Sequence, residues 1–156
     1  ARVAWEGLRP LLQKKDAELD ATISREFTAL QKLLDAVGSP FLKLNFDISH
    51  FNVQGIPYQE SVPLLAPHTV HTHVKSERGR APEHEFLIPG EADFDWTGYL
   101  HLMRQHGYDG FITAEVSIMV QKRPDYDPLA AAELTYRTMD RAFRDAGIAR
   151  PPKALR

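Results

Sequence analysis

The sequence predicts an α/β fold of the (β/α) barrel type, with four β/α units and parallel strands. Two observations lead to this prediction. Segments of strand character alternate with amphipathic helical segments along the chain, and such alternation is typical of a parallel sheet built through right-handed crossovers. The chain has 156 residues, whereas a complete eight-unit barrel takes roughly 250 residues. We therefore expect half a barrel.

The first predicted unit combines a short strand with a strongly patterned helix. Residues 8–13 are the candidate strand, weakened by Pro10, which cannot donate to a ladder. Ser24 suits the N-cap of a helix over residues 25–37, and Gly38 suits its C-cap. The apolar residues of this helix fall on one face at helical spacing: Phe27, Leu30, Leu33, Leu34 and Val37.

The second and third units follow the same order. Residues 41–46 alternate between apolar and polar as a strand does, and a short helix is expected over residues 57–65. Residues 69–74 are rich in β-branched residues and predict the next strand. We expect residues 75–92 to form a long polar loop, and loops of this length in compact domains are often functional.

The last predicted elements have clear end signals. Asp95 can cap a helix that ends at Gly107, and residues 110–116 predict the fourth strand. Asp127 opens a long amphipathic helix that is closed by Gly147. The four units are then complete, each with one strand followed by helical structure.

The composition excludes several classes of protein. The chain has no cysteine, which excludes disulfides and thiolate metal sites. Its net charge is -2 with the signs interspersed, so we expect neither a nucleic-acid partner nor a membrane partner. No apolar run approaches the roughly 20 residues of a membrane helix. We expect a cytoplasmic protein in which residues 1–147 form a single domain and residues 148–156 a loose basic tail.

Polar side chains follow the carboxyl ends of three predicted strands. Asp47 and His50 follow the second strand, His73 ends the third and Glu115 ends the fourth. Side chains at these ends line the site in parallel α/β sheets. Two carboxylates and an imidazole suit a divalent cation, so we expect Asp47, His73 and Glu115 to share one metal ion. His71 points to the same face as His73, either as a partner that orients it or as a packing residue.

Each of these residues also has an ordinary structural alternative. An aspartate after a strand is more often a helix or turn cap than a ligand. A histidine in a strand is more often a satisfied core group, and Glu115 could be half of a buried ion pair. The ligand interpretation is favoured because the three residues occupy equivalent positions in successive units.

Four motifs resemble the last four units of the xylose-isomerase-like barrels. They read LNFDISHFNVQG, VHTHVKSERG, FLIPGEADFDW and GYDGFITAEVSIMV. The superfamily comprises sugar and sugar-phosphate isomerases and epimerases, with inosose dehydratases and apurinic endonucleases as relatives. The resemblance covers about residues 5–147, and its motifs specify the superfamily and not the substrate.

The resemblance implies a TIM barrel with one divalent ion, often manganese, zinc, cobalt or magnesium. Members hold this ion with a Glu, an Asp, a His and a Glu from the last four strands. Asp47, His73 and Glu115 match the last three of these ligands, and Gln13 stands where the first is expected. The sequence is thus similar to the superfamily at three of four metal positions.

The resemblance also implies catalytic and substrate-binding residues. Glu115 matches the glutamate that is both ligand and acid/base, and His50 matches the histidine beside the reacting groups that contacts the substrate. Arg78 and Glu91 match positions at which members bind substrate. We expect these four side chains to surround a sugar.

The chain departs from the family pattern at three positions. Ser76 and Ala92 stand where many relatives have Asp and Gly, and Gln13 replaces the first metal-binding Glu. An amide oxygen can coordinate a metal but carries no charge and cannot shuttle a proton. We therefore expect epimerisation with two bases to be impaired, while isomerisation on one face stays feasible.

The implied function is that of a divalent-metal-dependent sugar or sugar-phosphate isomerase or epimerase that works through an enediolate. The alternative is a catalytically degenerate half barrel that acts as a binding or assembly module. An abasic-site nuclease is disfavoured because its multi-zinc cluster needs more ligands than the sequence offers. Since half a barrel has exposed strand edges, we expect either a homodimer or the C-terminal part of a longer protein.

Overall fold

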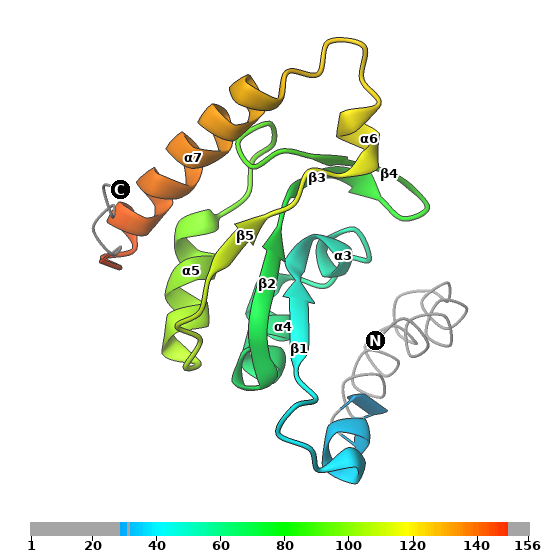
Figure 1. Cartoon of the computed structure of the whole chain (residues 1–156), viewed down its shortest axis with the longest axis vertical. Coiled ribbons are helices and arrows are strands. Elements are labelled where there is room, and N and C mark those ends of the chain that lie inside the picture. Colours follow the sequence, from blue (N-terminus) through cyan, green and yellow to red (C-terminus); the bar gives the residue numbers. More distant parts are fainter. Residues whose placement is uncertain (1–28, 31, 150–156) are drawn as a thin grey trace. The chain divides into compact units, whose positions relative to one another are not determined.

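The structure, a computed structural model, describes residues 29–30 and 32–149 (Figure 1). Residues 1–43 and 44–156 form two compact units. In the first unit, residues 32–37 are helical and end at Gly38, as predicted. Gly38 has a φ of 58°, and its N–H donates to the Leu34 carbonyl at 2.9 Å. The predictions for residues 8–13, including Gln13, and for Ser24 lie outside the described residues.

The second unit contains a parallel sheet of three strands in the order β1–β2–β5. These are β1 (Leu44–Asp47), β2 (Thr69–Val74) and β5 (Ile112–Ala114). The strand predicted over 69–74 is confirmed, while the strands predicted over 41–46 and 110–116 start later or are shorter. The described residues therefore confirm a parallel α/β fold with three parallel strands, while the strand predicted over residues 8–13 lies outside them.

Helices connect the strands of this sheet. Between β1 and β2 lie α3 (Ile48–Asn52), α4 (Tyr58–Leu65) and the 3₁₀ turn η2 (Ala66–His68), and α5 (Trp96–Gln105) precedes β5. After β5 come α6 (Ile118–Gln121) and α7 (Pro128–Asp145). Figure 1 shows α3 beside the arrowheads of β1 and β2, with α4 behind these strands. No helix among residues 29–30 and 32–149 has the length and apolar character to span a membrane.

The helix ends follow the capping signals of the sequence. The Asp95 carboxylate accepts a hydrogen bond from the Gly98 N–H at 2.8 Å, and that of Asp127 accepts one from the Leu129 N–H at 2.8 Å. Both carboxylates satisfy N–H groups that the first helical turn leaves unpaired. The predicted helices after Asp95 and Asp127 are thereby confirmed. The short helix α6, capped by Ser117, was not predicted.

The core of the second unit lies between the sheet and the helices. The Phe46 and Tyr99 rings, with centroids 6.5 Å apart, join β1 to α5. Helix α5 packs against both α4 and α7. The largest fully buried apolar side chains of this core are Tyr99, Phe46, Ile48, Leu100, Met103, Val62 and Val74. This packing fixes the sheet from behind and sets the positions of the strand ends.

The predicted loop over residues 75–92 is wrong in part, because it contains an antiparallel hairpin. Its strands are β3 (Ser76–Arg80) and β4 (Glu83–Leu87). Charged residues and Gly79 give β3 a low strand propensity, so the local sequence does not indicate a strand. The hairpin is held by contacts with α3 and its surroundings: the Arg80 guanidinium donates to the Asn52 carbonyl, and the Ala81 N–H to the Val53 carbonyl at 2.8 Å.

Candidate metal centre

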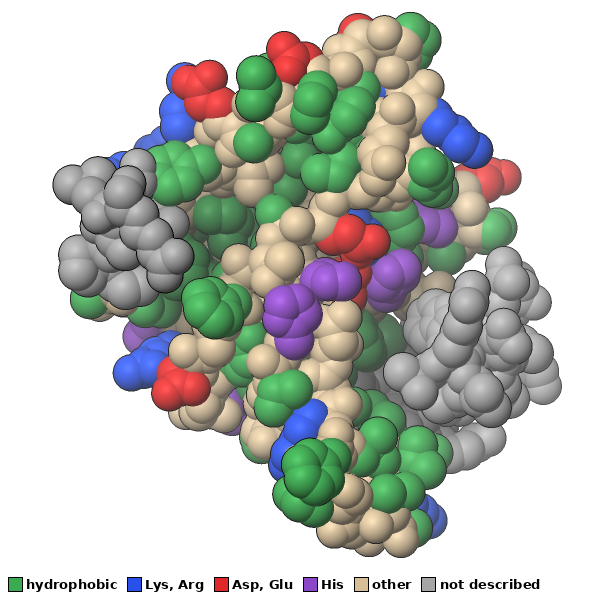
Figure 2. All heavy atoms as spheres, in the orientation of Figure 1, with side chains coloured by type: hydrophobic (Ala, Val, Ile, Leu, Met, Phe, Trp, Pro, Cys, Tyr) green, Lys and Arg blue, Asp and Glu red, His purple; other side chains and the backbone are tan. Residues whose placement is uncertain are grey.

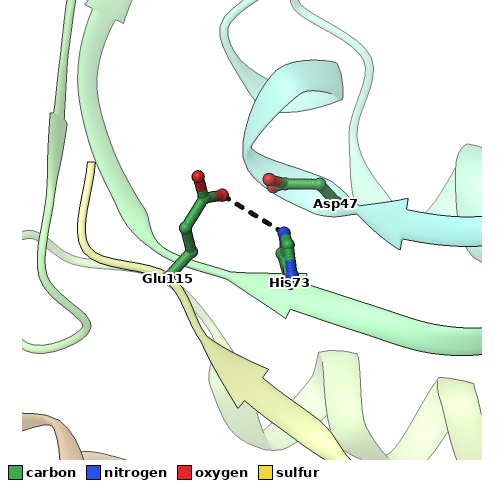
Figure 3. A group of neighbouring side chains, drawn as sticks. All are labelled: Asp47, His73 and Glu115. Atoms are coloured by element: carbon green, nitrogen blue, oxygen red, sulfur yellow. Dashed lines mark ion pairs between the residues drawn. The ribbon is translucent and has the colours of Figure 1, made fainter. Parts of the chain in front are cut away.

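Three side chains from separate strands meet at the carboxyl end of the parallel sheet. Figure 2 shows histidine and acidic side chains gathered near the middle of one face. In Figure 3, Asp47 and Glu115 approach His73 from either side. One ligand atom from each of the three residues lies within 4.8 Å of the other two, and His73 Nδ1 is 3.3 Å from Glu115 Oε2. The structure thus brings together the three predicted metal ligands.

The register of the sheet explains this convergence. Asp47 is the last residue of β1 and pairs in register with His73 of β2. Glu115 directly follows β5, and its N–H donates to the Val74 carbonyl at 3.0 Å, which extends the pairing by one residue. Because neighbouring parallel strands end at the same level, side chains that are 26 and 42 positions apart in the chain become neighbours.

Asp47 has two roles, one for each carboxylate oxygen. Its Oδ1 accepts hydrogen bonds from the Ser49 N–H at 3.1 Å and the Ser49 hydroxyl at 2.6 Å, which caps α3. Its Oδ2 faces the cluster and lies 3.5 Å from His50 Nε2. The capping alternative and the ligand interpretation are therefore compatible, because the cap orients the second oxygen.

Lys75 lies between the two carboxylates, a placement that the sequence analysis missed. Its side chain is 2% exposed. The ammonium donates to Asp47 Oδ2 and, at 2.6 Å, to Glu115 Oε2. It also lies 4.8 Å from the centre of the Phe86 ring and 3.5 Å from His50 Nε2. The signal that could have found it is the spacing of two from His73, which places both residues on the same side of the extended chain.

The pKa values of Asp47 and His50 are both lowered, for different physical reasons. Burial alone would raise the pKa of Asp47, but the Lys75 ammonium, His50 and the hydrogen bonds from Lys75 and Ser49 outweigh it, so the pKa is lowered. Burial also lowers the pKa of His50 below its ordinary value of 6.5, against the pull of Asp47 and Glu115. At neutral pH the site therefore holds an ionised Asp47 and a neutral His50.

The structure places both other histidines of the prediction beside the cluster. His50 lies on α3, and its ring packs edge-on against Phe86 with the centroids 5.1 Å apart. The His71 and His73 rings have centroids 5.3 Å apart, in keeping with their expected common face. His71 thus packs on His73 without being part of the three-residue group.

Arg78 and Glu91 have other partners. Arg78 pairs with Glu85 across the hairpin, and 65% of its side chain is exposed. The Glu91 carboxylate accepts a hydrogen bond from the Ile88 N–H at 2.9 Å and pairs with Arg123 at 2.8 Å. These contacts tie Glu91 to the turn after β4. The substrate-binding roles of Arg78 and Glu91 stay predictions.

The donor set fits the kind of ion that the sequence implies. Two carboxylates and an imidazole are ligands that manganese, zinc, cobalt and magnesium accept to different degrees. The spacing of the three ligand atoms allows one cation to contact all of them after small side-chain movements. The buried ammonium of Lys75 is the feature of the site that opposes a cation.

Comparison with known proteins agrees with the α/β fold. The family model of the xylose isomerase-like TIM barrel matches residues 7–141. The chain is also 29% identical over 89 residues to the uncharacterized protein MJ1311 of Methanocaldococcus jannaschii. That match covers 56% of this chain and 30% of the length of the relative. The chain belongs to the xylose isomerase-like TIM barrel family.

Proposed function

We propose that the protein is a divalent-metal-dependent isomerase or epimerase-like enzyme acting on a sugar or sugar phosphate. The observation that carries this proposal is the meeting of Asp47, His73 and Glu115 at the carboxyl end of the sheet. Family membership supports this proposal, because one shared catalytic role then explains all three residues better than three unrelated structural roles. Asp47, His73 and Glu115 would hold the ion, with Gln13 as the fourth candidate ligand.

The ion, when bound, would polarise a sugar carbonyl and stabilise the negative charge of an enediolate. Glu115 is the proposed base that removes and returns a proton at the neighbouring carbon. Its Oε2 is fixed by Lys75 and His73. Its Oε1 accepts no hydrogen bond from the described residues, and 40% of the side chain is exposed, so it is accessible to a substrate. Neutral His50 is suited to hydrogen bond a sugar hydroxyl.

The residues of the candidate site favour a reaction in which a proton is transferred on one face of the substrate only. Epimerisation needs a second group that delivers a proton from the opposite face. The position of the first family glutamate holds Gln13, which cannot do this. We therefore propose an aldose–ketose type of isomerisation with Glu115 as the single carboxylate base.

Metal analysis tests the proposal most directly. The purified protein, dialysed against Mn²⁺ and then against buffer, should retain close to one ion per chain by elemental mass spectrometry. Glu115→Gln should lose most of this ion, whereas Glu133→Gln, an exposed glutamate on α7, should retain it. An absence of retained or titratable Mn²⁺, Zn²⁺, Co²⁺ and Mg²⁺ in the unchanged protein would contradict the proposal.

Solvent deuterium distinguishes the two forms of proton transfer. Incubation of candidate 2-ketoses in heavy water should give exchange of a hydrogen at C1, with no inversion at C3. Inversion at C3 at a rate similar to exchange would refute the single-base form while leaving the metal proposal intact.

The second candidate is a catalytically inactive binding or assembly module. It is favoured by one observation, the Lys75 ammonium that already neutralises part of the charge of Asp47 and Glu115. Under this alternative the carboxylates of Asp47 and Glu115 and the imidazole of His73 form an ion-pair network with Lys75, and this network stabilises the strand ends. The metal analysis above separates the two candidates.

We also propose that additional strands complete the sheet. Among the described strands, β1 and β5 each pair only with β2, so both present an outer edge. Such edges accept other strands, either from a second copy of the chain or from further β/α units. Light scattering at several concentrations tests the first possibility, because a dimer that is completed through these edges should dissociate on dilution.

A further inference from the structure

We infer that Lys75 competes with a divalent cation for Asp47 and Glu115, so that the site is closed by the lysine until a cation displaces it. The inference rests on the proposed function, since it assumes that a cation binds at these residues. It adds a lysine-closed state of the site that the family resemblance does not include. The consequence is that Lys75 limits the affinity of the site for metal.

The hydrogen bonds of Lys75 use the oxygens that a cation needs. Asp47 Oδ1 is already taken by the N–H and hydroxyl of Ser49, which leaves Oδ2 to face the cluster. Lys75 donates to this Oδ2 and to Glu115 Oε2, and Glu115 Oε2 is also the oxygen nearest to His73 Nδ1. A cation shared by Asp47, His73 and Glu115 would therefore meet the ammonium at the same two atoms.

The burial of Lys75 makes this competition strong. The side chain is 2% exposed, so water does not screen the ammonium from a nearby dication. With both carboxylates ionised, the lysine cancels one of their two negative charges. The net negative charge that attracts a dication is then only half of the charge that the two carboxylates alone would supply.

The displaced ammonium has an alternative partner in Glu77 of the hairpin. Glu77 Oε2 is buried and accepts no hydrogen bond from the described residues. Glu77 pairs across the hairpin with Phe86, whose ring lies under the ammonium of Lys75. A buried acceptor without a donor is costly. A shift of Lys75 from Asp47 and Glu115 toward Glu77 would therefore give both the ammonium and Glu77 a partner, while a cation takes the two vacated oxygens.

The test compares metal affinity in Lys75→Met, which keeps the length and burial of the side chain but removes its charge. Calorimetric titration of the whole chain with Mn²⁺ and with Zn²⁺ should show binding that is tighter by on the order of tenfold or more than in the unchanged protein. Lys122→Met, at an exposed lysine, is the matched control and should leave the affinity unchanged. Equal or weaker binding in Lys75→Met would overturn the inference.

A second variant tests the inference without touching the lysine. Glu77→Gln keeps the contacts of Lys75 with Asp47 and Glu115 but removes the charged alternative partner, and should weaken Mn²⁺ binding severalfold. The same change made in the Lys75→Met background should have no effect on affinity. An equal effect of Glu77→Gln in both backgrounds would show that Glu77 acts independently of Lys75.

The outcomes separate this inference from the proposed function. If neither the unchanged protein nor Lys75→Met binds a cation, the metal site itself is wrong and both proposals fall. If the unchanged protein binds a cation and Lys75→Met binds it no better, the metal site stands and only the competition is wrong. Should Lys75→Met fold poorly without metal, a larger rise of its melting temperature with Mn²⁺ than in the unchanged protein is the expected result, and an equal or smaller rise would refute the inference.

Discussion

The parallel sheet and the β3–β4 hairpin contribute to the same site in different ways. The sheet carries Asp47, His73 and Glu115 on strands that are packed from behind by Phe46, Tyr99 and other core residues. The hairpin consists of short polar strands that are held by ion pairs and by hydrogen bonds to the α3 region. It brings Phe86 and Glu77 close to Lys75.

This difference shows that the sheet sets the positions of the candidate ligands, whereas the hairpin changes the charges around them. Core packing fixes where the three candidate ligands lie, because moving a strand end would disrupt a buried apolar layer. The hairpin changes the electrostatic surroundings, since its Phe86 ring covers the Lys75 ammonium and its Glu77 supplies a third carboxyl near that ammonium. Substitutions in the sheet should therefore cost stability, and substitutions in the hairpin should mainly alter pH dependence and cation affinity.

The largest expected effect comes from breaking the sheet at Phe46. This residue is 2% exposed and lies directly before Asp47. Phe46→Ala should lower the free energy of unfolding by about 3–5 kcal/mol, because it removes a large apolar side chain and leaves a cavity. Urea denaturation measures this. Phe111→Ala, at a ring that is 82% exposed, is the control and should change stability by about 0.5 kcal/mol or less.

The next largest effect is expected from Asp47→Asn. The change leaves an oxygen for the α3 cap but removes a charged partner of the buried Lys75, which should cost about 2–3 kcal/mol at pH 7. Because folding lowers the pKa of Asp47, its contribution is complete above the unfolded value of 3.8 and is lost as the pH falls through the lower folded pKa. The difference from the unchanged protein should therefore shrink in strong acid.

Urea denaturation of Asp47→Asn at pH 7 and at pH 3 or lower checks this dependence. Asp93→Asn, at an exposed aspartate, provides the comparison and should have little effect at either pH. A stability difference for Asp47→Asn that stays constant across this range would show that the charge of Asp47 does not stabilise the fold.

A smaller effect of opposite sign is expected from Glu77→Gln in the hairpin. Burial raises the pKa of Glu77 from 4.5 to about 7, with Asp47 adding to the rise. The folded protein thus holds a proton there that the unfolded chain releases above pH 4.5, so the wild-type residue destabilises increasingly as the pH rises from 4.5 through 7. Removing its charge should raise stability at pH 8 by about 1–2 kcal/mol after allowance for solvent screening.

Melting curves at pH 5 and pH 8 test this prediction for Glu77→Gln. The gain in melting temperature should be larger at pH 8 than at pH 5. A gain of the same size at both values, or a loss at pH 8, would mean that the Glu77 carboxyl is stabilised as a carboxylate by its surroundings.

The smallest effect should come from the exposed pair of the hairpin. Arg78 and Glu85 are 65% and 45% exposed, and ion pairs in such surroundings contribute little because water screens them. Arg78→Ala should change the free energy of unfolding by about 0.5 kcal/mol or less. If Arg78 binds substrate as predicted, the same variant should also raise the KM of the proposed isomerase reaction.

Several elements could be predicted because their signals are local. The strand over 69–74 was indicated by its β-branched residues, and the helices after Asp95 and Asp127 by capping side chains and apolar spacing. The hairpin could not be predicted in this way. Its strands have the charged composition of a loop, and they form because α3 and the sheet offer partners for Arg80 and Ala81.

The candidate site likewise has features that the sequence predicts and features that only the fold determines. The sequence by itself determined that Asp47, His73 and Glu115 would meet, because each lies at the carboxyl end of a strand and parallel strands end at one edge of a sheet. Only the tertiary structure decided that Lys75 lies between two of them and that the half-buried Glu77, with its buried Oε2, lies near the lysine. The physical reason is that strand ends are fixed by backbone periodicity, whereas the direction and pairing of a long charged side chain depend on which acceptors the folded chain brings within reach.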